Sequence, residues 1–143
     1  MTKSNRHLLL FAFAALALAC SASAQDYTLF VASLDGTQEV PPNKSEASGY
    51  AYFLLSADQT QFITLAFHNV ENANASHIHR GEAGVSGPII HGFRSFVSPI
   101  IDVWNLTKGD VNDLMNGNLY INVHSQMYGG GEVRGQIYPY STE

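Results

Sequence analysis

Cysteine and charge are both scarce in this chain of 143 residues. It contains one cysteine, Cys20, and 13% of its residues are charged, with seven Lys and Arg against twelve Asp and Glu. A single cysteine forms no disulfide within the chain, so the stability of the fold has to come from packing or from a bound metal. The shortage of basic residues excludes nucleic-acid binding, because a phosphate backbone demands a basic surface.

Long apolar runs are also missing. The longest, over residues 8–19, has about a dozen residues, whereas a bilayer span needs roughly 20. It follows Lys3 and Arg6 and comes before the small-residue triplet at 22–24, which is the pattern of a secretory signal peptide. We therefore expect a leader over residues 1–24 and no membrane span.

The expected leader leaves one domain, residues 25–143, with five basic against twelve acidic side chains. Its predicted destination is the periplasm or the medium outside the cell, where disulfides are usual although this domain has no cysteine for one. A lipoprotein site at Cys20 is an alternative, but Ala17 stands where such a signal normally has leucine.

Alternation of apolar and polar residues with period two dominates the expected domain and predicts β-strands. The predicted strands cover residues 27–32, 49–55, 61–70, 118–124 and 131–138. The faces expected to be apolar carry Ile63, Leu65 and Phe67 in the third of these strands and Leu119, Ile121 and Val123 in the fourth. Short strands separated by turn signals indicate a β-sandwich or a Greek-key barrel.

One helix is predicted, over residues 107–116. Thr107 is placed to cap its first turn, and Gly117 is placed to end it. Val111, Leu114 and Met115 share one face of this helix, which we expect to pack on the sheet.

The candidate chemistry lies in the histidines. His77 and His79 form a His-x-His pair, and in a strand such side chains point to the same face about 7 Å apart, so both can bind one metal ion. His124 ends a later strand on the side away from its apolar face. If the two strands are neighbours, three imidazoles converge, and His91 is a possible fourth ligand.

Each of these residues also has an ordinary interpretation. His77 and His79 can be exposed polar residues, and His91 can be a loop or strand residue beside the site. His68 is expected on an outward, solvated face of its strand, while His7 belongs to the leader.

Three neutral imidazoles suit Cu(II), Zn(II) or Ni(II), and copper leads because the affinity order of first-row ions peaks there. Met115 and Met127 are candidate thioether ligands for Cu(I), although packing for the former and loop exposure for the latter are the ordinary interpretations. Glu132 and Arg134, two residues apart in the last strand, are expected to form a surface ion pair.

Five segments resemble the CHRD domain, a module first described in chordin and common in secreted bacterial proteins. They read, in the order of the family, LDGTQEVPP, SGYAYFLL, ASHIHRGEAGVSGPII, LTKGDVNDLMNGNLYINVHS and GGEVRGQIYP. The resemblance covers essentially all of residues 25–143. It implies an all-β fold, an antiparallel immunoglobulin-like or superoxide-dismutase-like Greek-key β-sandwich with one short helix. The His-x-His and Asn-Val-His of the family map onto His77, His79 and His124, whereas position 91 is usually apolar in the family.

A more distant similarity is to the Cu,Zn superoxide dismutases, which also carry a His-x-His strand, a later Val-His and a glycine-rich turn. The zinc cluster and the cysteine pair of those enzymes have no counterpart here, so a related site would hold copper alone. Neither Arg134 nor Arg80 matches the spacing of the arginine that guides their substrate.

Three functions therefore remain open. The first is an exported module that binds or buffers copper, and the second is a copper-only enzyme of superoxide-dismutase type. The third is an extracellular or periplasmic adhesion or protein-interaction module that needs no metal. The negative net charge disfavours efficient attraction of an anionic substrate, and no nucleophile motif of a hydrolase is present.

Overall fold

The protein is described here by a computed structural model, which covers residues 26–141. The expected leader and Cys20 lie outside the described residues. The elements run β1 (Tyr27–Asp35), η1 (Gly36–Gln38), β2 (Ser48–Ser56), β3 (Gln61–His68), β4 (Ala73–Arg80), β5 (Ile89–Gly92), β6 (Ile100–Asn105), α2 (Lys108–Met115), β7 (Leu119–Ser125), β8 (Val133–Gln136) and β9 (Tyr138–Pro139). Within these residues no helix is both long and apolar enough to span a membrane.

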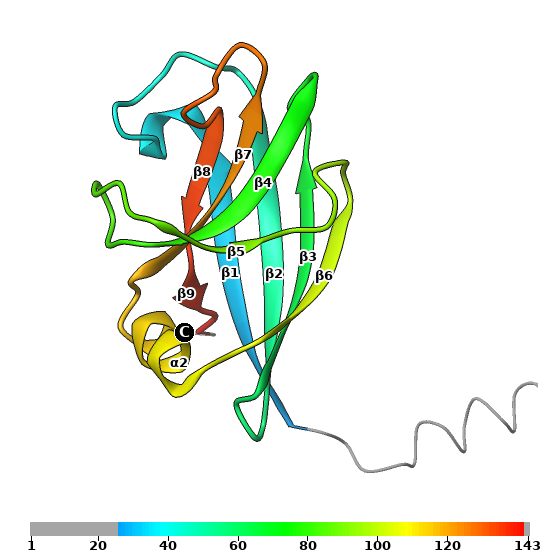
Figure 1. The fold of residues 1–143 in the computed structure, drawn as a ribbon, viewed down its shortest axis with the longest axis vertical. Coiled ribbons are helices and arrows are strands. Elements are labelled where there is room, and N and C mark those ends of the chain that lie inside the picture. Colours follow the sequence, from blue (N-terminus) through cyan, green and yellow to red (C-terminus); the bar gives the residue numbers. More distant parts are fainter. Residues whose placement is uncertain (1–25, 142–143) are drawn as a thin grey trace, which may run out of the picture.

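The strands form one antiparallel sheet in the order β5-β4-β7-β8-β1-β2-β3-β6, with β9 added beside β1. The sheet curls into a nearly closed barrel, so that β4, β5, β7 and β8 lie across the wall made by β1, β2, β3 and β6 (Figure 1). The prediction of an antiparallel all-β fold with one short helix is confirmed.

The core lies between the two walls of this barrel. Phe53 and Phe62 stack with their ring centroids 5.0 Å apart, and Phe30 meets Phe62 edge to face at 5.9 Å. From the opposite wall Ile78 on β4 and Ile121 on β7 complete the packing, both fully buried. The alternate side chains of β4 and β7 therefore point outward, and these include the candidate metal ligands.

The predicted inner face of β3 is wrong. Phe62, Thr64 and Ala66 are buried, whereas Leu65 is 38% and Phe67 44% exposed. Both faces of this strand carry apolar residues, so the period of the pattern does not say which face turns inward. The packing of the large core rings determines the inward face, because Phe62 stacks on Phe53 of the neighbouring strand.

The reversed face also corrects the interpretation of His68, which lies on the same side of β3 as the core residues. Its ring is half-buried, with Nε2 2.9 Å from the carbonyl oxygen of Phe96 and Nδ1 accepting a hydrogen bond from the backbone N–H of Val70. Burial lowers the pKa of His68. The ring is a partner of the backbone at the end of β3 and not an outward, solvated group.

The helix α2 begins as its capping residues predict. Thr107 and Asp110 form a capping box, in which each side chain accepts a hydrogen bond from the other residue's backbone N–H. Gly117, with a φ of 69°, follows the last turn. Met115 is 46% exposed, so the expected packing of this side chain is wrong, while Leu114 is fully buried.

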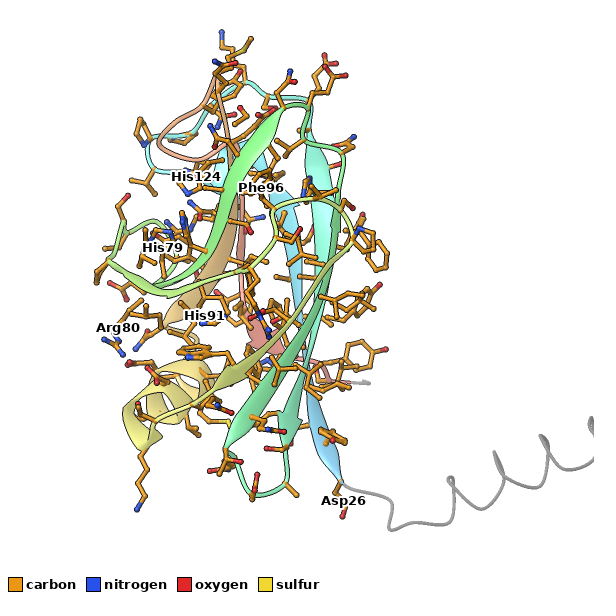
Figure 2. The ribbon with its side chains drawn as sticks, turned by 45° about the vertical axis from the view of Figure 1, so that its right-hand side comes forward. Asp26, His79, Arg80, His91, Phe96 and His124 are labelled. Carbon is orange, nitrogen blue, oxygen red and sulfur yellow. The ribbon has the colours of Figure 1, made fainter. Side chains whose placement is uncertain are left out.

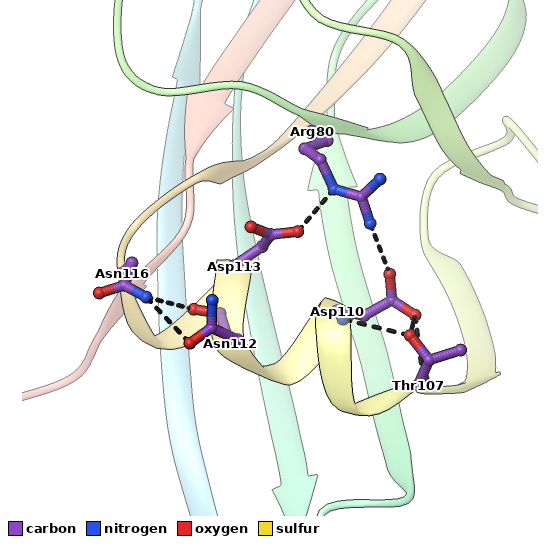
Figure 3. A network of polar contacts seen from close by, with 6 residues as sticks. All are labelled: Arg80, Thr107, Asp110, Asn112, Asp113 and Asn116. Atoms are coloured by element: carbon purple, nitrogen blue, oxygen red, sulfur yellow. Dashed lines mark hydrogen bonds and ion pairs between the residues drawn. The ribbon is translucent and has the colours of Figure 1, made fainter.

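An ion-pair network ties this helix to the end of β4 (Figure 3). The guanidinium of Arg80 donates to Asp110 at 3.0 Å and to Asp113 at 2.5 Å. Since Arg80 directly follows His79, the network fixes the end of the strand that carries two of the candidate ligands.

Candidate metal centre

Three histidines meet on the outer face of the neighbouring strands β4 and β7. In the register of this pair Ala75 lies opposite His124, His77 opposite Asn122 and His79 opposite Tyr120. Ile78 points to the core between His77 and His79, so these two rings share the outer side. One nitrogen from each of His77, His79 and His124 lies within 4.8 Å of the other two. The predicted convergence of the three rings is confirmed.

Backbone carbonyl groups hold two of the rings in one tautomer. Nδ1 of His79 lies 2.9 Å from the carbonyl oxygen of Gly87, and Nδ1 of His124 lies 3.0 Å from that of Gly129. A carbonyl oxygen can only accept, so both Nδ1 atoms carry the proton and both Nε2 atoms present a lone pair. This arrangement is typical of metal-binding histidines, whose second nitrogen donates to a neighbouring carbonyl group.

The Nε2 atom of His79 is buried and has no hydrogen-bond partner. The ring is 8% exposed, so water cannot easily serve this atom from outside. His77 and His124 are in direct contact, with Nδ1 of His77 3.0 Å from Nε2 of His124. Oδ1 of Asn122 lies 3.1 Å from the same Nε2 atom; because His124 carries its proton on Nδ1, this contact is a hydrogen bond only when the amide turns so that its NH2 group donates to Nε2. A buried lone pair without a donor beside two further imidazole nitrogens fits a metal ion.

The surroundings of His77 and His79 favour the neutral form of both rings. Burial, and next the nearby rings of His124 and His79, lower the pKa of His77 to about 4. Burial also lowers the pKa of His79, against the opposing effect of its hydrogen bond to Gly87. Because only a neutral imidazole can bind a metal, both rings have the charge state that ligation requires at neutral pH.

Aromatic and cationic groups pack beside the three histidines. The ring of Tyr120 is stacked on that of His79, with centroids 4.8 Å apart and planes 10° from parallel. The guanidinium carbon of Arg134 lies 3.4 Å from the centroid of Tyr120. Arg134 also donates to the carbonyl groups of Glu82 and Val85, in the loop that includes Gly87. The arginine therefore anchors the loop whose carbonyl orients His79.

The expected surface ion pair of Glu132 and Arg134 is wrong. Arg134 is 2% exposed and Glu132 8% exposed. Glu132 accepts a hydrogen bond from the Ser45 hydroxyl at 2.7 Å. The loops over residues 36–47 and 81–88 bury β8 from outside, which the alternation within one short strand does not reveal.

His91 lies apart from the three clustered histidines. It pairs with Ile78 in the register of β4 and β5, so its side chain is on the inner side of the sheet, opposite to His77 and His79. Its ring stacks on Trp104 at 5.0 Å and its Nε2 atom is 2.6 Å from Oδ2 of Asp102. Figure 2 shows His91 well below His79 and His124.

Several neighbours of the three histidines were missed by sequence reasoning. Tyr120 and Asn122 alternate with the core residues of β7 and share the face of His124, so the period-two pattern could have found them. The carbonyl groups of Gly87 and Gly129 come from loops, and the type of residue does not predict where a backbone carbonyl group will point. Met127 is 82% exposed on the loop after β7, which agrees with its ordinary interpretation.

A family model, the CHRD domain, matches residues 30–137. No curated protein and no solved structure matches the chain. The more distant likeness to the Cu,Zn superoxide dismutases is thus not borne out by these comparisons. The match runs from Phe30, within β1, to the end of β8 and includes all three clustered histidines. The chain belongs to the CHRD domain family.

Proposed function

We propose that this CHRD domain binds one transition-metal ion, copper by preference, through Nδ1 of His77 and the Nε2 atoms of His79 and His124. The observation that carries the proposal is the buried, unpartnered Nε2 atom of His79, in a ring that brings one nitrogen within 4.8 Å of a nitrogen of each of the other two histidines. A group of this kind is costly to leave unsatisfied, and a metal ion at about 2 Å from each nitrogen satisfies it.

The ligand set supports the choice of metal. The cluster consists of three imidazoles and contains no carboxylate or thiolate. Such a set suits Cu(II), Zn(II) and Ni(II), and disfavours Mg²⁺ and Ca²⁺, which take oxygen ligands. Copper binds most tightly in the first-row order, so it is the ion expected when the three compete at equal concentration.

The tautomers define how the site would accept the ion. His79 and His124 already present lone pairs from Nε2, so neither ring has to turn or move a proton. In its contact with the lone pair of His124 Nε2, 3.0 Å away, Nδ1 of His77 is the donor, so His77 has to move its proton from Nδ1 to Nε2 before Nδ1 can bind the ion. The hydrogen bond between these two rings is therefore exchanged for two metal–nitrogen bonds, and each Nδ1–H bond to a loop carbonyl stays in place.

Three protein ligands leave at least one coordination position open, so the site suits either storage of copper or redox chemistry. We favour binding and buffering by an exported protein, secreted or periplasmic, because the chain carries an acidic net charge of −5 that repels superoxide. A dismutase assay on the copper-loaded chain separates the two. Disproportionation much faster than that of copper bound to a short peptide would favour the enzyme.

The test is competitive metal uptake by the full chain, produced with export in a bacterial host and purified without an affinity tag. We expect one copper per chain, retained over zinc and nickel, by elemental analysis and titration. The variant with His77, His79 and His124 all changed to Ala should lose this uptake, and His91→Ala, the matched control, should keep it. Equal uptake by the wild type and the triple variant would contradict the proposal.

A further inference from the structure

Apolar side chains cover the outer face of the wall formed by β1, β2, β3 and β6. In one row across the strands Val31 pairs with Tyr52, Tyr52 with Leu65 and Leu65 with Ile101. In a second row Leu29 pairs with Leu54, Leu54 with Ile63 and Ile63 with Val103. Directly paired residues point to the same side of a sheet, so the eight side chains form one continuous surface, called here the apolar face.

The apolar face is open to solvent. Ile101 is 67%, Tyr52 46% and Val103 42% exposed. Beside the two rows Tyr50 is 61% and Phe67 44% exposed, and these two residues pair with each other. Figure 2 shows side chains with rings standing out from the right of this wall, on the side away from His79 and His124.

Charge is almost absent from this surface. Among the outward positions of the four strands only Asp35, at the end of β1, is charged, and its carboxylate is engaged by Thr37 and Gln38. Tyr52 on the face and its neighbours Tyr50 and Phe67 offer roughly 100 Å² each, so together with the aliphatic side chains the exposed area is on the order of 800 Å². Each partner of a standard interface contributes about 800 Å².

We propose that the apolar face is the dimer interface of this protein, covered by the same face of a second copy. The chain has a net charge of −5, so two copies repel each other over most of their surfaces. The apolar face is the large surface on which they meet without opposing charges. A twofold contact places one patch against itself, which an uncharged patch of aliphatic side chains around Tyr52 permits.

The packing of two such walls follows the ordinary geometry of stacked sheets, with about 10 Å between them. The three clustered histidines lie on the other wall of the barrel, so dimer formation leaves both candidate metal sites uncovered. The proposed dimer is therefore independent of the proposed metal binding, and either proposal can be wrong while the other holds.

The test is analytical ultracentrifugation of the full, untagged chain over a range of concentrations. We expect a dimer that dissociates on dilution. Association should strengthen as NaCl rises, because salt screens the repulsion between two acidic chains while the apolar contact is unaffected. A wild-type chain that stays monomeric at all concentrations and salt levels would overturn the proposal.

Two variants place the interface. Leu65→Lys sets a charge in the middle of the apolar face and should raise the dissociation constant at least 100-fold. Ile101→Lys should act in the same direction, and its side chain is exposed enough for the monomer fold to tolerate the change. Met127→Lys, the matched control, adds the same charge at an 82% exposed position on the loop after β7 and should leave the dimer intact. A dimer that withstands Ile101→Lys as well as it withstands Met127→Lys would locate the contact elsewhere and overturn the proposal.

Discussion

The Nε2 atom of His91 lies 2.6 Å from Oδ2 of Asp102, and this contact joins the two end strands of the sheet. His91 belongs to β5 and Asp102 to β6, the strands between which the barrel is left open. Arg94 donates to the other oxygen of Asp102 at 2.9 Å. Side chains therefore link the barrel at the place where no ladder of backbone hydrogen bonds does.

The first prediction concerns this link. Asp102 is 3% exposed, so replacing His91 with Ala leaves one of its carboxylate oxygens buried and short of a partner. We expect His91→Ala to lower the free energy of unfolding by about 1–3 kcal/mol, the cost of such an unpaired group. Urea unfolding measures this loss. A stability equal to that of the wild type would mean that the contact contributes nothing to closing the barrel.

The second prediction concerns a buried acid. Glu39 is 6% exposed, and burial raises its pKa from 4.5 to about 7 despite the opposing charge of Arg134. A group whose pKa is raised by folding stabilises the protein fully below the unfolded-state value, and this contribution is lost as the pH rises through 7. The difference amounts to at most about 3 kcal/mol.

The variant Glu39→Gln isolates this effect, since its side chain resembles the protonated acid at every pH. We expect the variant to gain stability relative to the wild type between pH 5 and pH 8, as measured by urea unfolding at each pH. The matched control is Glu71→Gln at an exposed position, where the difference from the wild type should stay constant. A constant difference for Glu39→Gln as well would show that this carboxyl group is not perturbed.

How much the sequence reveals depends on how distinct the two faces of each strand are. On β7 the aliphatic residues Leu119, Ile121 and Val123 alternate with polar and aromatic ones, and the predicted inner face is confirmed. On β3 both faces are apolar, and the prediction is wrong. The outward apolar residues of β3, Ile63, Leu65 and Phe67, belong to a surface that β3 forms together with its neighbouring strands. The sequence of β3 alone does not reveal this surface.

The candidate site shows the same division. The spacing of His77 and His79 and the alternation in β7 predict the three converging rings. The tautomers depend on the carbonyl groups of Gly87 and Gly129, and the pKa of His77 is lowered by burial and then by the nearby rings of His124 and His79. The position of His91 could not be predicted in this way. It pairs with Ile78 on the neighbouring strand, and this register places its side chain on the inner side of the sheet.

The third prediction tests the corrected face of β3. Phe62 is fully buried between Phe30 and Phe53, so Phe62→Ala should lower the free energy of unfolding by about 3–5 kcal/mol. Phe67→Ala removes the same ring from an exposed position of the same strand and should cost about 1 kcal/mol or less in the monomer. Chemical unfolding at low protein concentration makes the comparison. Equal losses for the two variants would contradict the face assignment.

The fourth prediction concerns the carbonyl group that orients His79. A Cβ atom built on Gly87 would lie 1.6 Å from the carbonyl oxygen of Arg80, so Gly87→Ala forces the loop away from β4. The hydrogen bond from Nδ1 of His79 to Gly87 is then lost, and with it the fixed tautomer and direction of the ring. Loss of such a partner typically weakens metal binding 10–100-fold, and we expect a decrease of that size in copper affinity.

Gly129→Ala is the matched control for this change. Gly129 supplies the equivalent carbonyl group to His124, yet a Cβ atom there meets nothing within 4 Å, so the loop and its hydrogen bond should persist. Competition titration against a chelator of known affinity, together with circular dichroism to confirm folding, compares both variants with the wild type. If Gly87→Ala folds normally and binds copper as tightly as Gly129→Ala, the Gly87 carbonyl does not prepare His79 for the metal, and ligation would have to rest on the spacing of the three rings alone.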